Sequence, residues 1–208
     1  MIITIGREYG SGGKYIGERL AEELNMKLYD SELIDRVSKE RNIDINLLNE
    51  NDEKHKNSFW YTLAMASMAS YESINSLTEL PSDDKYFIEE SKVIEEIADE
   101  GNSIIIGRCS NVVLQNRKDV VNIFIYSSDE KFKIDRKVEF AGLDEKKALK
   151  LMHKKDKERA TYYNYYTNKI WGARDSYDLL VDSSKLGIEN TVKFIKDYIK
   201  YLEQKWTL

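Results

Sequence analysis

Short runs of apolar, mostly β-branched residues recur along the chain, and longer stretches with helical spacing separate them. The runs predict strands at residues 2–5, 26–29, 103–107, 120–126 and 177–182. Between them, apolar residues recur every three or four positions, as on the buried face of an amphipathic helix. Strands that alternate with helices favour a mostly parallel sheet with helices on both faces and right-handed crossovers. The pattern therefore predicts an α/β protein.

Two stretches interrupt this alternation. Residues 42–80 lose the strand signals and read as a helical insertion, whose aromatic and methionine side chains favour packing on the main domain or, alternatively, a flap over a substrate. Ser127 and Glu130 have the spacing of a capping box, which predicts a helix start there. The second stretch, residues 141–176, contains a helix that becomes strongly basic and suits a mobile lid. We expect a single domain, residues 1–208, that carries both parts.

A glycine cluster follows the first strand and leads directly into a helical pattern. Its residues are Gly10, Ser11, Gly12, Gly13 and Lys14. Glycines allow positive φ angles and let backbone N–H groups approach an anion, and the positive end of the helix dipole points to the same place. The cluster therefore predicts a phosphate-binding loop, with a tight turn as the alternative.

The loop departs from the P-loop pattern G-x-x-x-x-G-K-[S/T]. When the residues are counted back from Lys14, Gly13 is in place, but Glu8 stands where the first glycine belongs. Tyr15 stands where Ser or Thr would bind magnesium. Other residues must therefore decide what the loop binds.

Charged residues follow two of the predicted strands. Arg108 comes directly after the strand at 103–107, and Arg36 lies in the helical stretch after the strand at 26–29. Open α/β sheets bind ligands at the carboxyl ends of their strands, so two guanidinium groups near the glycine loop favour an anion site. The alternative for each is an ordinary surface arginine.

Asp156 and Arg159 lie three residues apart in the basic helix, on one face. A solvated helix face with ordinary ion pairs would look similar. However, the excess of lysine and arginine is local in a chain whose net charge is −5. A basic helix that closes over transferring phosphates needs this composition.

Composition excludes several classes of function. The net charge of −5 argues against a general nucleic-acid binder, and no window is apolar enough to span a membrane. One cysteine and two histidines exclude a disulfide and a Cys/His zinc site. No basic segment precedes an apolar core at the N-terminus, so no secretion signal is expected and the predicted compartment is cytoplasmic. The sequence does not indicate an oligomeric state.

Together these features resemble the cytidylate kinase family, most closely the bacterial cytidylate kinase-like branch of the P-loop nucleoside monophosphate kinases. The resemblance spans nearly the whole chain and rests on residues 6–17, 29–36, 106–108, 156–160 and 177–189. It implies a three-layer P-loop NTPase fold with a five-stranded parallel sheet, a helical NMP-binding insertion and a basic lid. The implied reaction transfers the γ-phosphoryl group of ATP, with Mg²⁺, to CMP, dCMP or a similar small acceptor.

The resemblance also implies roles for individual residues. Arg36 and Arg108 would hold the phosphate of the acceptor, and Ser31 would contact the acceptor. Arg159 would stabilise charge on the transferring group, with Asp156 orienting the lid or the acceptor. The loop residues would bind the phosphates of ATP; they are Gly10, Ser11, Gly12, Gly13, Tyr15 and Lys14, the last of which would also be catalytic.

The loop differs from the cytidylate kinase loop G-P-S-G-S-G-K-G-T at two functional positions. The lysine position falls on Gly13, so Lys14 is displaced by one residue, and Tyr15 replaces the last threonine. A shift of one residue at a helix start rotates a side chain by about 100°. Lys14 therefore reaches the phosphates only if the loop backbone compensates, and no magnesium ligand is identified. A P-loop kinase for another small metabolite and a nucleotide-binding regulatory protein are the alternatives.

Overall fold

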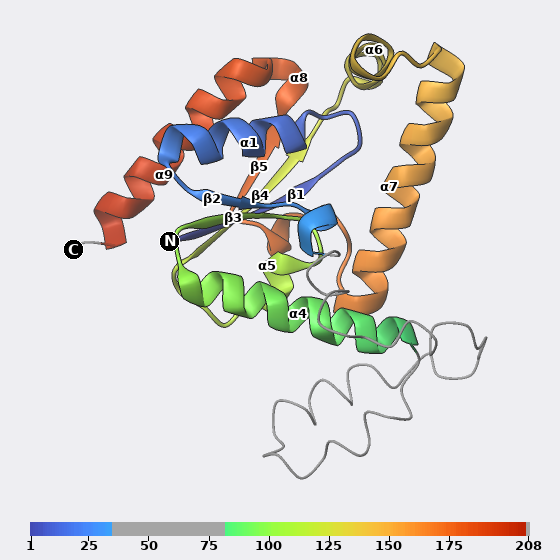
Figure 1. The fold of residues 1–208 in the computed structure, drawn as a ribbon. Helices are drawn as coiled ribbons and strands as arrows, with labels where there is room; N and C mark the ends of the chain where they lie inside the picture. The colour runs from blue at the N-terminus through green and yellow to red at the C-terminus, as the bar shows by residue number, and fades with distance from the viewer. Residues whose placement is uncertain (35–81, 207–208) are drawn as a thin grey trace. The chain divides into compact units, whose positions relative to one another are not determined.

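A five-stranded parallel sheet forms the centre of the structure, a computed structural model that describes residues 1–34 and 82–206 (Figure 1). The strands occur in the order β2-β3-β1-β4-β5 across the sheet. Their bounds are β1 (Ile2–Arg7), β2 (Lys27–Tyr29), β3 (Ser103–Ile106), β4 (Val120–Tyr126) and β5 (Leu179–Asp182). The predicted α/β class and the five predicted strand positions are confirmed.

Strand β1 lies at the middle of the sheet and sets the position of the site. Ile5 pairs in parallel register with Ile106 of β3 on one side and with Ile123 of β4 on the other. The chain crosses from one side of β1 to the other between β3 and β4, and such a change of direction opens a crevice at the carboxyl ends of the strands. Residues that follow β1, β3 and β4 therefore meet at one edge.

Helices connect the strands. Their bounds are α1 (Gly13–Leu24), α4 (Ser82–Glu100), α5 (Ser110–Val113), α6 (Glu130–Ala141), α7 (Glu145–Thr167), α8 (Ser183–Leu186) and α9 (Ile188–Trp206), with a 3₁₀ turn, η3, at Arg174–Ser176. The chain divides into a unit of Met1–Ser31 with Ile94–Leu208, which contains the whole sheet, and a second unit of Glu32–Val93. The described part of the second unit comprises residues 32–34 and the first part of α4.

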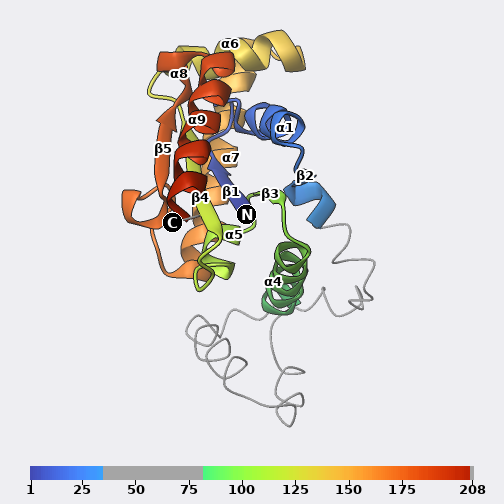
Figure 2. The same cartoon turned by 90° about the vertical axis from the view of Figure 1, so that its left-hand side faces the viewer.

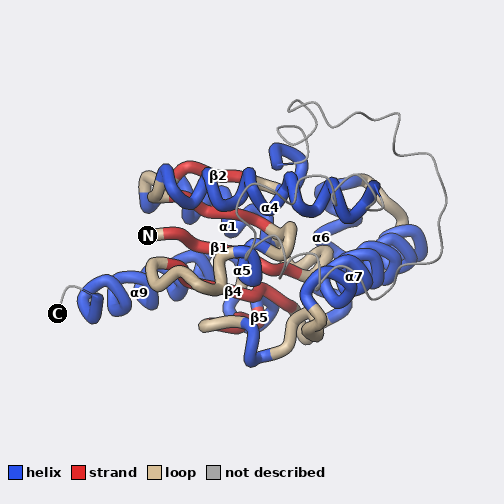
Figure 3. Tube along the Cα trace, turned by 90° about the horizontal axis from the view of Figure 1, so that it is seen from below, coloured by secondary structure: helices blue, strands red, loops and turns tan. Residues whose placement is uncertain are grey.

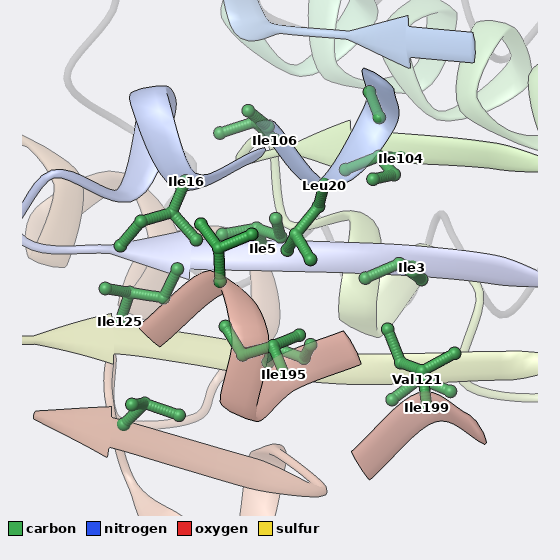
Figure 4. Close-up of a cluster of buried hydrophobic side chains, with 14 residues drawn as sticks. Ile3, Ile5, Ile16, Leu20, Ile104, Ile106, Val121, Ile125, Ile195 and Ile199 are labelled. Atoms are coloured by element: carbon green, nitrogen blue, oxygen red, sulfur yellow. The ribbon is translucent and has the colours of Figure 1, made fainter. Parts of the chain in front are cut away.

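Helices α1 and α9 pack together on one face of the sheet (Figures 1 and 2), and α5 lies on the other face (Figure 3). Between the sheet and the α1–α9 pair lies a cluster of buried aliphatic side chains (Figure 4). Ile5 from β1, Ile16 from α1 and Ile195 from α9 are all fully buried there. Burial of side chains of this kind is worth roughly 1.5–3 kcal/mol each and holds α1 and α9 against the sheet.

Two details of the helices differ from the sequence predictions. The predicted capping box of Ser127 and Glu130 is wrong, because Asp129 caps α6 by accepting hydrogen bonds from the N–H groups of Lys131 and Phe132. The hydroxyl of Ser127 instead bonds to the backbone of Asp129. The short helices α5 and α8 were not predicted. The predicted insertion at residues 42–80 lies outside the described residues.

A buried hydroxyl ties the end of the sheet to the glycine loop. Ser183, at the start of α8, is fully buried, and its Oγ lies 2.7 Å from Ser11 O and 3.0 Å from Tyr126 O. The hydroxyl can donate to either carbonyl, so it connects the loop after β1 with the end of β4. The position of the loop therefore depends on a residue that follows the last strand.

We expect Ser183→Ala to lower the free energy of unfolding by about 1–3 kcal/mol, because the carbonyl groups of Ser11 and Tyr126 lose the one hydroxyl donor that they share. Urea denaturation followed by circular dichroism measures the change. Ser176→Ala is the control, since the Ser176 hydroxyl lies at the surface, 3.5 Å from Asp175, and should change stability by less than about 0.5 kcal/mol. Equal losses in the two variants would contradict the proposed link.

Candidate functional site

The loop between β1 and α1 has the backbone conformation of an anion-binding turn. Gly10 and Gly12 have φ angles of 86° and 84°, in the left-handed region that side chains disfavour. Gly12 is the N-cap of α1, and no side chain caps this helix. The first N–H groups of α1 therefore lie at the loop without a side-chain acceptor, as at helix ends that bind phosphate.

Side chains from other elements hold the loop in place. Ser11 is fully buried and donates its hydroxyl to Glu8 O over 2.9 Å. The Glu8 carboxylate accepts from the backbone N–H of Ser127 over 3.1 Å and from Lys133 Nζ over 3.0 Å. Ser11 thus holds the loop from within, and Ser127 together with Lys133 of α6 holds it through the Glu8 carboxylate. The Ser11 hydroxyl has a structural partner inside the loop rather than a place at its outer surface.

Arginine side chains gather at this edge of the sheet from separate elements. Arg7 ends β1, Arg108 follows β3, and Arg159 lies on α7. Arg159 Nη1 donates to the backbone oxygen of Arg7 over 3.1 Å. Burial and then the charges of Arg159 and Arg108 lower the pKa of Arg7 to about 9. Arg7 is therefore charged at neutral pH, although burial and the neighbouring arginines disfavour its charge.

The Asp156 and Arg159 pair attaches α7 to the glycine loop. Asp156 Oδ1 accepts from the backbone N–H of Tyr9 over 2.6 Å and lies 3.7 Å from Arg159 Nη1. Burial raises the pKa of Asp156 and lowers the pKa of Arg159, while the attraction between the two groups opposes both shifts. The predicted pair thus acts between the helix and the loop rather than on a solvated helix face.

The ring of Tyr9 lies between cations of two helices. Arg159 Cζ is 5.7 Å and Lys137 Nζ of α6 is 4.3 Å from the ring centroid, within the range of cation–π contacts. Burial is the largest cause that lowers the pKa of Lys137. Both α6 and α7 therefore bring positive charge to the residue that precedes the first loop glycine.

The side chains of Lys14 and Tyr15 each lie beside a carboxylate of another part of the chain. Lys14 Nζ lies 2.8 Å from Asp30 Oδ2, after β2, with 54% of the Lys14 side chain exposed. The Tyr15 hydroxyl lies 3.5 Å from Glu189 Oε1 at the start of α9. The structure thus brings Gly10, Ser11, Gly12 and Gly13 together in the loop, whereas Lys14 pairs with Asp30, which also attracts Arg7, and Tyr15 lies beside Glu189.

The predicted acceptor residues fall in three different settings. The Ser31 hydroxyl accepts from Arg7 Nη2 over 3.3 Å. Arg108 has a positive φ angle of 54°, and its Cζ lies 5.3 Å from the ring centroid of Tyr162 on α7. Arg36 lies outside the described residues. Ser31 therefore contacts Arg7 directly, whereas Arg108 acts on Arg7 through its charge.

Sequence reasoning did not single out Arg7, Lys133 or Lys137. Arg7 follows an apolar run directly, which is the same signal that identified Arg108. The two lysines lie on a helix where no residue is buried, so their approach to the loop depends on tertiary packing and left no signal in the pattern.

The family follows from the sequence match. A family model described as "Cytidylate kinase-like family" matches residues 2–185. The chain belongs to the cytidylate kinase-like family. No curated protein sequence matches the chain. The resemblance seen in the motifs is therefore confirmed at the level of the family.

Solved structures similar to this cytidylate kinase-like chain support the fold. An uncharacterized protein from Eubacterium ventriosum is 29% identical, with a TM-score of 0.72 over 96% of this chain and 98% of that chain. Shikimate kinase from Bacteroides thetaiotaomicron is 14% identical, with a TM-score of 0.52 over 96% of this chain and 98% of that chain. The sheet order and these likenesses show the P-loop kinase fold.

The described residues do not supply the usual protein ligand for magnesium. Within residues 1–34 and 82–206, no group of three or more His, Cys, Asp or Glu side chains could hold a metal ion. Ordinary P-loops use a Ser or Thr hydroxyl after the lysine. Here the Ser11 hydroxyl bonds to Glu8 and the Tyr15 hydroxyl lies beside Glu189. Among the helices of the same two ranges, none is long and apolar enough to cross a bilayer.

We expect Glu8→Ala to lower the free energy of unfolding by about 1–3 kcal/mol, because the N–H of Ser127 and the charge of Lys133 lose their acceptor. The Lys133 side chain is only 12% exposed, so water compensates poorly. The same substitution in a Lys133→Met background should cost less, since one of the two groups is then absent. Urea denaturation of the parent protein, the two single variants and the double variant measures the coupling free energy between Glu8 and Lys133. If the losses of stability from Glu8→Ala and Lys133→Met simply add, the contact between the two side chains does not stabilise the fold.

Proposed function

We propose that this cytidylate kinase-like protein transfers the γ-phosphoryl group of ATP, bound as its Mg²⁺ complex, to a nucleoside monophosphate, with CMP and dCMP as the first candidates. One observation carries the proposal: the guanidinium groups of Arg7, Arg108 and Arg159 meet beside the glycine loop at the carboxyl edge of the sheet. Phosphoryl transfer needs positioning and compensation of charge more than a protein nucleophile. A cluster of this kind supplies both.

The proposed step needs no proton transfer from the protein. An oxygen of the acceptor's phosphate attacks the γ-phosphorus of ATP, and the bond to the β,γ-bridging oxygen breaks, so ADP leaves. The N–H groups of the loop would hold the phosphates of ATP. Arg159 would offset charge on the transferring group, and Asp156 would hold α7 against the loop through Tyr9 N.

The acceptor would bind at the other side of the same edge. Arg108 would hold its phosphate, with Ser31 as a further contact and with Arg36 contributing from outside the described residues. ATP as the donor would place the reaction in the cytoplasm. No nucleic acid or membrane takes part in the proposed reaction.

Two other functions use the same features. A kinase for a different small metabolite would keep the donor site and change the acceptor. The shikimate kinase described above has a similar fold, and its name gives shikimate, which is not a nucleotide, as the acceptor. A regulatory protein would bind the nucleotide without turnover, since Lys14 is paired with Asp30. A panel of nucleoside monophosphates, with ADP release as the readout, tests the first proposal. ATP binding with no ADP formed from any of them would refute it, and a thermal-shift screen of acceptors would then follow.

We expect Arg159→Ala to lower kcat for phosphoryl transfer by about 10³-fold or more, because charge on the transferring group loses its guanidinium. A coupled assay of ADP release measures the rate, and thermal melting verifies the fold. Arg19→Ala is the matched control, since Arg19 lies on α1 and pairs with Glu22 and Glu23. For a regulatory protein, Arg159→Ala would leave basal ATP hydrolysis unchanged.

A further inference from the structure

Positions 7 and 13 compete for one space at the start of α1. A Cβ atom added to Gly13 would lie 2.5 Å from Arg7 Cβ and 3.0 Å from Arg7 Cγ. Carbon atoms that are not bonded do not pack this closely, since their van der Waals minimum lies near 3.5–4.0 Å. The stem of Arg7 therefore lies in the space that a side chain at position 13 would need.

A second glycine receives the head of the same side chain. A Cβ atom added to Gly107 would lie 3.2 Å from Arg7 Cζ and closer still to Nη1. Gly107 also has a φ angle of 85°, which side chains disfavour. Arg7 thus extends along Gly13 and over Gly107, from the middle of the sheet to the end of β3.

This arrangement is the reverse of the ordinary loop. The pattern G-x-x-x-x-G-K has its first glycine six residues before its lysine. When the lysine falls on position 13, as in the match to G-P-S-G-S-G-K-G-T, that first glycine falls on position 7. This chain instead has Arg7 and Gly13. The side chain and the glycine have exchanged places, and the collision described above explains why both changes are needed together.

We propose that Arg7, and not Lys14, supplies the cation that contacts the β- and γ-phosphates of ATP, in place of the missing loop lysine. The inference rests on the proposed function only in taking ATP as the donor. Arg7 reaches the site from the strand rather than from the helix, and its fork can bind two phosphate oxygens at once. Lys14 is one residue further along the helix, paired with Asp30 at 2.8 Å.

The charges around Arg7 favour an anion. Its Nη2 donates to the neutral hydroxyl of Ser31, and no carboxylate of the described residues forms an ion pair with it. Its charged neighbours Arg159 and Arg108 repel it, whereas Asp30 and Asp156 attract it less strongly. A bound phosphate would attract all three guanidinium groups and so offset their mutual repulsion.

Binding of ATP, ADP and AMP, measured by isothermal titration calorimetry, tests the assignment without an acceptor. We expect Arg7→Met to weaken ATP binding by roughly 10- to 100-fold, the value of a charge-assisted hydrogen bond to phosphate. AMP, which has no β- or γ-phosphate, should bind nearly as before. Arg7→Lys should retain part of the affinity. Arg19→Met is the matched control, since Arg19 lies on α1 and pairs with Glu22 and Glu23, and it should leave all three affinities unchanged.

A double variant that moves the cation from position 7 to position 13 tests whether either position can supply it. Arg7→Gly alone should lose ATP affinity as Arg7→Met does. Arg7→Gly combined with Gly13→Lys restores the ordinary order of glycine and lysine, and we expect it to recover ATP binding to within about tenfold of the parent protein. Gly13→Lys alone should fold poorly, because the new side chain meets the stem of Arg7.

Thermal melting without nucleotide distinguishes binding from a structural role. Because the charge of Arg7 is disfavoured in the free protein, Arg7→Met should melt at the same temperature or higher. A lower melting temperature with unchanged ATP affinity would overturn the assignment. So would a loss of ATP binding in Lys14→Met that Arg7→Met does not show, or a parent protein that does not bind ATP. ATP binding that follows the expected order, with no acceptor phosphorylated, would refute the proposed reaction and leave the role of Arg7 intact.

Discussion

The close packing of helix α1 on strands β1 and β3 is the constraint on which the site depends. Gly13 and Gly17 lie four residues apart and therefore share one side of the helix. A Cβ atom at Gly17 would lie 2.7 Å from Ile106 Cδ1, as one at Gly13 would collide with Arg7. The helix can approach the sheet only because these positions lack side chains. Its N-terminus is thereby held against the end of β1, where the loop glycines turn.

Electrostatic coupling follows from this geometry. The chain has a net charge of −5, yet guanidinium groups from β1, the end of β3 and α7 meet at one edge. Asp156 moderates this cluster and also accepts from the backbone of Tyr9. A movement of α7 therefore changes the charge at the site and the anchoring of the loop together. The charge at this edge and the position of the loop are thus linked through a single carboxylate.

The sequence predicted the sheet well and the site only in part. Runs such as Ile104-Ile105-Ile106 are unambiguous because strands buried on both faces need apolar residues throughout. The four-residue helices α5 and α8 are too short to show a period. The direction of Lys14 depends on the position of Asp30 after β2, which only the folded sheet defines. Arg7 gave a signal equal to that of Arg108, but its meaning required knowing that Gly13 and Gly107 lie beside it.

The hydrogen bond from Ser183 to the carbonyl of Ser11 also bears on biosynthesis. The loop occupies the first fifteen residues, but the hydroxyl that completes it is made 172 positions later. A ribosome must therefore synthesise all five strands before the loop can reach its final form. Until then, the nascent chain has its glycines and arginines but lacks the contact that orders them. The loop therefore gains its contact with Ser183 only after the last strand of the sheet has been made.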